Sequence, residues 1–206
     1  MRRVAFALVS AAFLSACLCG EPEGPVPLHT VSGTVTRAGA PVANAEVSFV
    51  YSALRDSPPR YDGTTDENGH YSVFVPEGTQ GYSARSLGTD AEFAVTAGNV
   101  VVDGDVELPI ALPRPLALEV GEVTADHVTL HWAATDVPGF QLYRLVTGTR
   151  EDLENGGGKL IRTLENLDDV EVIDEDLSTA PAWAYQLFAV GDVGTEVGSA
   201  IVEVAR

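Results

Sequence analysis

The stretch that decides the fold is Thr65-Asp66-Glu67-Asn68-Gly69-His70-Tyr71-Ser72-Val73-Phe74-Val75-Pro76. Within it, Tyr71, Val73 and Val75 occupy every second position, which is the period of a β-strand with one buried face. The preceding Asn68-Gly69 is a strong signal for a tight turn between two strands. The segment therefore predicts a strand that follows a hairpin turn and ends at a proline, which has no N–H for a ladder.

The same pattern extends on both sides of this stretch. Val47, Phe49 and Tyr51 alternate with polar residues, and turn signals stand at Ala38–Pro41 and Pro76–Gly78. Strands of this length, separated by turns at this spacing, predict a seven-stranded antiparallel sandwich.

The C-terminal half also has the period of strands. We predict three sets of residues that each share one face: Val128, Leu130 and Trp132; Phe140, Leu142 and Arg144, opposed to Gln141 and Tyr143; and Trp183, Tyr185, Leu187 and Ala189. The chain as a whole is therefore expected to be all-β.

Two proline-rich segments divide the chain. Glu21–Pro27 is predicted to be an extended spacer, and Leu112-Pro113-Arg114-Pro115 a short, stiff hinge. We therefore expect a tether over residues 17–28, one domain over 29–112 and another over 115–206, each of ordinary size for a small domain.

The 206 residues include 30 acidic and 12 basic side chains, for a net charge of −18. This charge excludes DNA, RNA and anionic lipid headgroups as expected partners, because all three attract basic surfaces. It also favours a monomer, because like-charged copies repel. Two cysteines are too few for a disulfide scaffold or a cysteine-based zinc cluster.

Residues 1–16 have the features of a secretory signal: Arg2 and Arg3, then the apolar run Val4–Leu14, which is too short for a permanent membrane helix. Leu14-Ser15-Ala16-Cys17 resembles the lipobox of bacterial lipoproteins. The resemblance implies cleavage before Cys17 and attachment of acyl chains there, which together anchor a protein stably. An ordinary secretory signal with an incidental cysteine is the alternative.

Two further expectations follow from the lipobox resemblance. Leu18, rather than an acidic residue, follows the lipidated position, which favours the outer membrane by analogy with lipoprotein sorting. Cys19 follows this bulky residue and is the poorer acceptor, so we expect a free thiol there.

The first domain resembles the carboxypeptidase regulatory-like family over about residues 29–110. The resemblance rests on Gly33-x-Val35, Gly39-x-Pro41-Val42-x-x-Ala45-x-Val47 and Thr65-Asp66-x-x-Gly69-x-Tyr71-x-Val73-x-Val75-Pro76-x-Gly78. It implies a transthyretin-like (prealbumin-like) β-sandwich without catalytic residues. The His/Arg cluster and the Tyr-Arg-Gly-Ser ending of hydrolytic transthyretin-like enzymes are absent from the sequence.

The second domain resembles a fibronectin type III domain over about residues 115–206. The motifs are Val128-Thr129-Leu130-x-Trp132, Gly139-Phe140-x-Leu142-Tyr143-Arg144, Asp174-x-x-Leu177 and Trp183-x-Tyr185-x-Leu187-x-Ala189. Trp183 stands where the family has the tyrosine of its tyrosine corner, and we expect its indole N–H to donate to the backbone instead. Together the two resemblances predict tandem immunoglobulin-like and prealbumin-like antiparallel sandwiches.

Candidate chemistry is sparse. His29 and His70 lie beside turns or strand ends, and His127 and His131 lie on the solvent face of one strand without an evident third metal ligand. No Gly-x-Ser-x-Gly motif is present, and Gly156–Gly158 is interpreted as a turn and not as a phosphate loop. We therefore predict no catalytic residue, no metal site and no cofactor; a pair of catalytic carboxylates remains the less favoured alternative.

Two other kinds of residue are candidates for binding. Groups of side chains with oxygen ligands are Asp62, Asp66 and Asn68, predicted in one loop, then Asp168, Asp169 and Glu171, then Asp174, Glu175 and Asp176; we interpret them as solvated loops, with calcium as the alternative. Tyr51, Tyr61 and Tyr82 are candidates for stacking on sugar rings, whereas both tryptophans are expected in the core.

These observations predict a non-catalytic envelope lipoprotein, anchored at Cys17, that acts as a protein-interaction or structural module. Its partner would bind through loops or through strand addition at an exposed edge. A carbohydrate-binding accessory lipoprotein is the alternative function.

Overall fold

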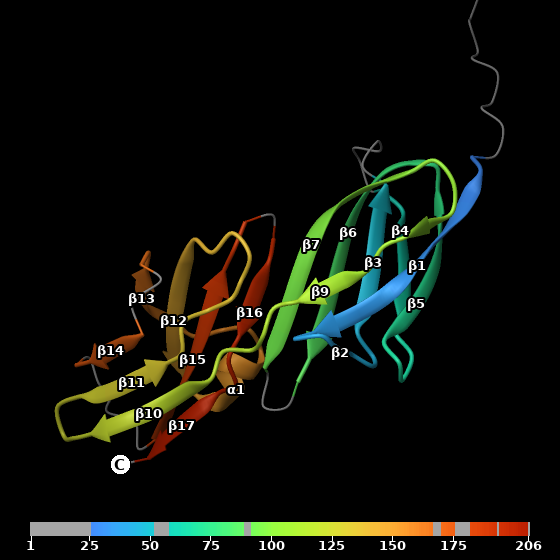
Figure 1. Ribbon diagram of the computed structural model, residues 1–206. Helices are drawn as coiled ribbons and strands as arrows, with labels where there is room; N and C mark the ends of the chain where they lie inside the picture. Colours follow the sequence, from blue (N-terminus) through green and yellow to red (C-terminus); the bar gives the residue numbers. More distant parts are fainter. Residues whose placement is uncertain are drawn as a thin grey trace, which may run out of the picture.

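The computed structural model describes residues 26–51, 58–88, 92–166, 170–175, 182–192 and 194–205. Strands make up nearly all of the regular structure, and one short helix, α1 (Arg150–Glu154), lies within the described ranges (Figure 1). The predicted all-β class is therefore confirmed.

The described residues contain seventeen strands, of which nine lie in the first half, some of them only two or three residues long. The nine are β1 (Leu28–Arg37), β2 (Ala40–Pro41), β3 (Glu46–Tyr51), β4 (Arg60–Thr64), β5 (His70–Pro76), β6 (Gly78–Leu87), β7 (Phe93–Val102), β8 (Val106–Glu107) and β9 (Ile110–Leu112). The second half contains eight: β10 (Leu118–Val123), β11 (Val128–Trp132), β12 (Leu142–Gly148), β13 (Lys159–Leu164), β14 (Glu171–Asp174), β15 (Ala182–Val190), β16 (Glu196–Gly198) and β17 (Val202–Ala205).

The first half differs from a purely antiparallel, seven-stranded sandwich. β1 pairs antiparallel with β2 and β5, but it pairs in parallel with β8 and β9. The chain returns along β1 after β7 in two short pieces, and strands of two and three residues are too short to show an alternating pattern in the sequence.

The predicted turn before β5 is confirmed. Gly69 has a φ of +75°, and an added Cβ would lie 2.7 Å from the Val35 carbonyl oxygen. Asp66 organises the turn, because its Oδ1 accepts hydrogen bonds from the backbone N–H groups of Asn68 and His70, at 2.8 and 2.9 Å. These bonds favour the ionised form and lower the pKa of Asp66 below its ordinary value of 3.8, with the bond from His70 first.

We expect the Asp66 carboxylate to stabilise the fold in a pH-dependent way. Because its folded-state pKa is lowered, its contribution is fully present above the unfolded value of 3.8 and is lost as the pH falls through the folded value. Asp66→Asn should therefore unfold at a lower temperature than wild type at pH 7, and the gap should shrink at acid pH. Thermal denaturation of both proteins at pH 7 and near pH 3 measures this; a gap that is independent of pH would contradict it.

In the second half, two of the three predicted faces are confirmed. Val128, Leu130 and Trp132 are buried on β11, as are the four predicted residues of β15. On β12 the predicted opposition of Leu142 and Arg144 to Tyr143 is confirmed, and the buried face is that of Tyr143. The placement of Phe140 with Leu142 and Arg144 is wrong, because the Phe140 ring packs against Tyr143. Phe140 precedes the strand, after a turn in which Gly139 has a φ of +62°, so the alternation does not continue from Phe140 into β12.

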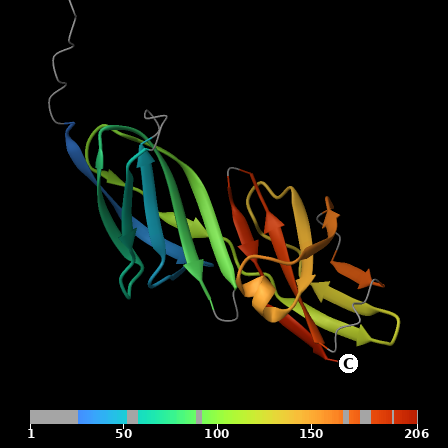
Figure 2. The same cartoon turned by 180° about the vertical axis from the view of Figure 1, so that it is seen from behind.

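The two halves share one sheet. The order β13-β12-β15-β16-β7-β6-β3-β4 runs from the second half into the first, with β17 beside β15. Opposite this nine-stranded sheet lie the sheet around β1 and β5 in the first half and the sheet β10-β11-β14 in the second. Seen from behind, the two halves lie end to end (Figure 2). The buried side chains form one core cluster with members from Val31 to Val204. The ladder between β7 and β16 therefore joins two sandwiches into one body.

Candidate interaction face

The joint between the two halves is a three-pair antiparallel ladder. Phe93, Ala94 and Val95 of β7 pair with Gly198, Val197 and Glu196 of β16. Val197 and Ala94 are fully buried, so the outer face of the sheet carries Phe93, Val95, Glu196 and Gly198. The ladder that links the halves is thus apolar on the inner face of the sheet, and its outer face continues from one half to the other.

Gly198 allows two aromatic rings to meet over the ladder. It pairs with Phe93 on one side and with Phe188 of β15 on the other. The two ring centroids are 5.8 Å apart with an interplanar angle of 50°, which is a favourable tilted arrangement. A Cβ at position 198 would lie 2.5 Å from the Phe93 ring, so only glycine leaves the ring in this place.

Charged side chains lie on either side of the rings. The Arg144 guanidinium is 5.4 Å from the Phe188 ring centroid and forms an ion pair with Glu196. On the first-half side, Arg85 Nε donates to Glu46 Oε2 at 2.7 Å. Each arginine on this part of the sheet therefore has a carboxylate beside it.

Between these ion pairs, the outer face carries a strip of apolar side chains. The cross-strand register places six of them on this face: Leu87, Phe93, Val95, Leu142, Phe188 and Val190. We call this set the junction strip. Leu87 is 67 % exposed and the other five are partly exposed. Apolar side chains that group together on a protein surface are a candidate interaction surface.

A polar hollow of about 340 Å³ lies on the same face, at the β3–β4 edge. Ser48 Oγ donates to Asp62 Oδ1 at 2.6 Å, and Arg60 Nε donates to the same oxygen at 2.6 Å. The hydroxyl and then the guanidinium lower the pKa of Asp62, and the carboxylate raises that of Arg60. Asp62 thus lies on a strand in an ion pair and not in the loop with Asp66 that the sequence suggested.

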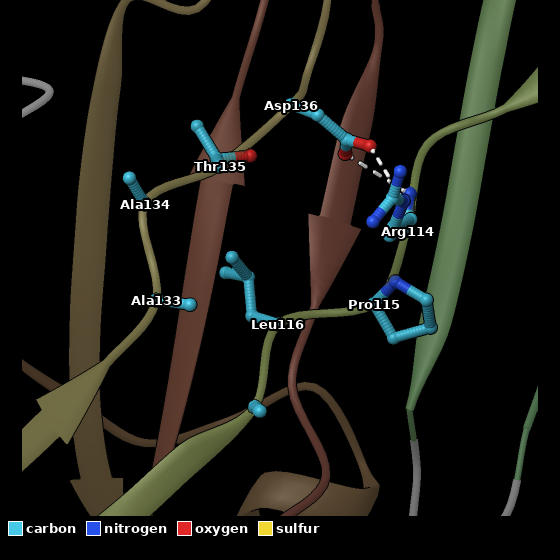
Figure 3. A pocket seen from close by; sticks show the side chains of 8 residues that line it. Arg114, Pro115, Leu116, Ala133, Ala134, Thr135 and Asp136 are labelled. Atoms are coloured by element: carbon cyan, nitrogen blue, oxygen red, sulfur yellow. Dashed lines mark hydrogen bonds and ion pairs between the residues drawn. The ribbon is translucent and has the colours of Figure 1, made fainter. Parts of the chain in front are cut away.

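A second hollow, of about 240 Å³, lies beside the linker between the two halves, the segment 112–115 that the sequence predicted to be a hinge (Figure 3). Beyond the Leu118–Trp132 pair the chains of β10 and β11 separate, and the hollow lies between residues 114–117 and 133–136. Arg114 closes its far end, with its Nε 3.1 Å from Asp136 Oδ2. The segment 133–136 forms the other side of the hollow, and its Thr135 N–H donates a hydrogen bond to the Tyr143 hydroxyl at 3.0 Å. The linker is therefore fixed to the second sandwich.

A buried polar chain occupies the core of the second sandwich. Trp183 Nε1 donates to the Tyr185 hydroxyl at 2.6 Å, and this hydroxyl donates to Asp174 Oδ2 at 2.8 Å. The expectation that Trp183 would donate to the backbone is therefore corrected: a tyrosine two residues along the same face is the nearer acceptor. Burial, and then the bond to the carboxylate, raises the pKa of Tyr185. The group is a hydrogen-bond donor in the fold and not a base.

The four histidines lie on strands or at turns, as the sequence suggested. His131 Nδ1 is 3.1 Å from Glu171 Oε2, and His127 Nε2 is 3.7 Å from Glu122 Oε2. The two histidines thus pair with separate carboxylates on the solvent side. In the described residues, no group of three His, Cys, Asp or Glu side chains is placed to hold a metal ion.

The three candidate tyrosines do not form an exposed platform. Tyr61 and Tyr82 pair with the buried Phe49 across the ladders, so their rings point to the core side and are only partly exposed. Tyr51 lies on the same side of β3 and packs against Gly78. The alternation in the sequence placed Tyr51 on the face of Val47 and Phe49, but it gave no strand and no orientation for Tyr61 or Tyr82.

Some predicted positions lie outside the described residues: Cys17, Cys19 and the signal, and Asp168, Asp169, Asp176 and Leu177. Within the described ranges, the structure contains no helix with the length and apolar character that a bilayer crossing requires. Sequence reasoning missed Phe93, Phe188 and Gly198. An apolar residue at an outward position of an alternating strand, such as Phe188, was the available signal.

No protein-family model matches the chain, and no curated protein matches it. Among solved structures, a DUF3823 family protein from Bacteroides ovatus is similar at 15% identity and a TM-score of 0.38, over 87% of this chain and 99% of that one. A candidate carbohydrate-binding protein from Bacteroides uniformis is similar at 14% identity and a TM-score of 0.39, over 86% of this chain and 99% of that one. A two-domain fibronectin type III segment of chicken tenascin is similar at 10% identity and a TM-score of 0.33, over 82% of this chain and 87% of that one. The fold assignment itself rests on the chain's own strands and register.

Proposed function

We propose that this chain is a non-catalytic lipoprotein of the bacterial cell envelope, anchored through Cys17, that acts as a protein-interaction or structural module. The observation that carries the proposal is the β7–β16 ladder, because it makes the two sandwiches one elongated body. The first strand begins at one end of this body, and the described C-terminal residues lie at the other (Figure 1). An anchor before β1 would thus hold the second sandwich away from the membrane.

The titratable groups with shifted pKa values support a structural role. Asp66 organises a turn, and Asp152 accepts from the Thr149 hydroxyl and N–H at the start of α1, which lowers its pKa. The Tyr185 hydroxyl lies in a buried hydrogen-bond chain. Each of these three groups has its bonds within the fold. Asp62 and Arg60, the two groups with shifted pKa values that line the polar hollow, are bonded to each other in an ion pair.

The anchor is tested by Cys17→Ala. We expect the wild-type protein to be recovered in the outer-membrane fraction and to take up radiolabelled palmitate, and the variant to take up none, because the acyl acceptor is gone. Membrane fractionation after a carbonate wash and autoradiography measure both. Cys19→Ser is the matched control and should behave as wild type. Equal labelling of Cys17→Ala and wild type would contradict the anchor.

The interaction role is tested by chemical cross-linking on intact membranes, followed by mass spectrometry. A protein cross-linked in near-equal amount supports an interaction module. Cross-linking only to other copies of this chain supports a structural role. The absence of any protein cross-link, together with retention of the purified chain on polysaccharide, would contradict the proposal in favour of glycan binding.

A further inference from the structure

The outer face of the nine-stranded sheet has an unusual charge pattern for so acidic a protein. In the described residues, the carboxylates that the register places on this face are Glu46, Asp62, Glu196 and Glu203, and each is paired with an arginine. The face is therefore locally neutral, although the whole chain carries a net charge of −18. A second acidic molecule meets less repulsion here than a surface of unpaired carboxylates would give.

The order of these charges across the sheet is also informative. Arg144 lies on β12, but its guanidinium extends over Phe188 of β15 toward Glu196. From β15 to β3 the face therefore presents the Arg144 guanidinium, then Glu196, then the Phe93 and Val95 positions of the junction strip, then Arg85, then Glu46. The signs run plus, minus, apolar, plus, minus. This order of charges is complementary to its own reverse, because each arginine of one copy then lies opposite a carboxylate of the other.

We propose that the junction strip is a docking surface for a second copy of this chain, related by a two-fold axis that runs along β7. Such an axis reverses the order of strands, so Arg85 of one copy faces Glu196 of the other and Arg144 faces Glu46. The junction strips pack against each other between these pairs, as two sheets do in face-to-face packing. Contacts of this kind, in which one patch binds itself, are the commonest in homodimers.

The direction of the two-fold axis is compatible with the anchoring of both copies in the same membrane. β7 runs from the junction toward the end of the body where β1 begins (Figure 1). A two-fold axis along β7 therefore places the first residues of both copies at the same end, and both anchors of the proposed function enter the same bilayer. This step alone rests on the proposed anchor; the charge pattern and the apolar strip do not. The dimer departs from the monomer expected from net charge, because the repulsive carboxylates lie mostly off this face.

The first test places a cysteine on the axis. In the full acylated chain with Cys19→Ser, Val95→Cys is expected to form a disulfide-linked dimer on membranes under mild oxidation, seen on a non-reducing gel. The matched control is Phe74→Cys, because Phe74 is 64 % exposed but lies on the opposite sheet. Equal dimer formation by both variants, or none by Val95→Cys, would overturn the proposal.

The second test exchanges charges between copies. Arg85→Glu and Glu196→Arg should each weaken self-association by about tenfold or more, because each creates two like-charge contacts. Mixed together, the two variants should restore association as a heterodimer, in which both contacts are complementary again. Arg60→Glu, at the β4 edge, is the control and should associate as wild type does. Sedimentation velocity of the full chain in detergent measures the wild type, the three variants and the mixture.

A mixture that associates no better than either variant alone would refute the trans pairing, because damage within one copy cannot be repaired by another. Association of the chain only with a different protein would refute the second copy as occupant. Membrane retention through Cys17 is measured separately, so failure of the dimer and failure of the proposed function are distinguishable.

Discussion

Replacing Gly198 by alanine is expected to uncouple the two sandwiches and to lower the free energy of unfolding by about 1–3 kcal/mol, the usual cost of forcing extra volume into a packed contact. Gly198 does not have a left-handed φ, so alanine can adopt its backbone conformation. The cost arises from the side chain: the new Cβ would lie 2.5 Å from the Phe93 ring, which must move away from Phe188. This aromatic contact spans the β7–β16 ladder, so its loss weakens the joint.

Calorimetry of the full chain measures this effect. Because one sheet and one core cluster extend through both halves, the wild-type protein is expected to unfold in a single transition. Gly198→Ala should give two, with the first about 2–10 °C below the wild-type midpoint. Gly104→Ala is the matched control, because a Cβ there meets nothing within 4 Å. An unchanged single transition in Gly198→Ala would show that the ladder does not couple the halves.

The sequence predicted the local features well because they depend on neighbours in the chain. The alternation of Tyr71, Val73 and Val75 identified β5, and Asn68-Gly69 identified the turn before it, since both signals are set by backbone geometry within a few residues. A local signal for α1 was also present but not used: Thr149 and Asp152 form a capping box.

Features that depend on distant residues could not be predicted in the same way. The pairing of β7 with β16 joins residues that are about a hundred positions apart, and no local pattern in either strand indicates which strand it pairs with. The junction strip exists only because this register places Phe93 and Phe188 on one face. The inward direction of Tyr143 likewise depends on where β12 begins after a turn, because a shift of one residue reverses every side chain.

Replacing Asp174 by alanine is expected to have the largest effect on stability, about 2–4 kcal/mol. Asp174 is 4 % exposed and accepts a hydrogen bond from the fully buried Tyr185 hydroxyl, which in turn accepts one from the Trp183 indole. Without the carboxylate, the proton of the fully buried hydroxyl loses this acceptor. Leaving a buried donor unsatisfied costs about 1–3 kcal/mol, and the hydrogen bond lost here is to a charged group, which is stronger than a neutral one.

Urea denaturation of the full chain, followed by tryptophan fluorescence, measures the loss directly, because Trp183 is one of two tryptophans and lies at the end of the chain of bonds. Asp174→Asn keeps an oxygen acceptor at nearly the same place, so it should lose less than the alanine variant. Glu171→Ala removes an exposed carboxylate from the same strand and should change the free energy of unfolding by less than about 1 kcal/mol. If Asp174→Ala were no more costly than Glu171→Ala, the carboxylate would not be the acceptor that this core requires, and the Trp183–Tyr185 pair would have to be satisfied in another way.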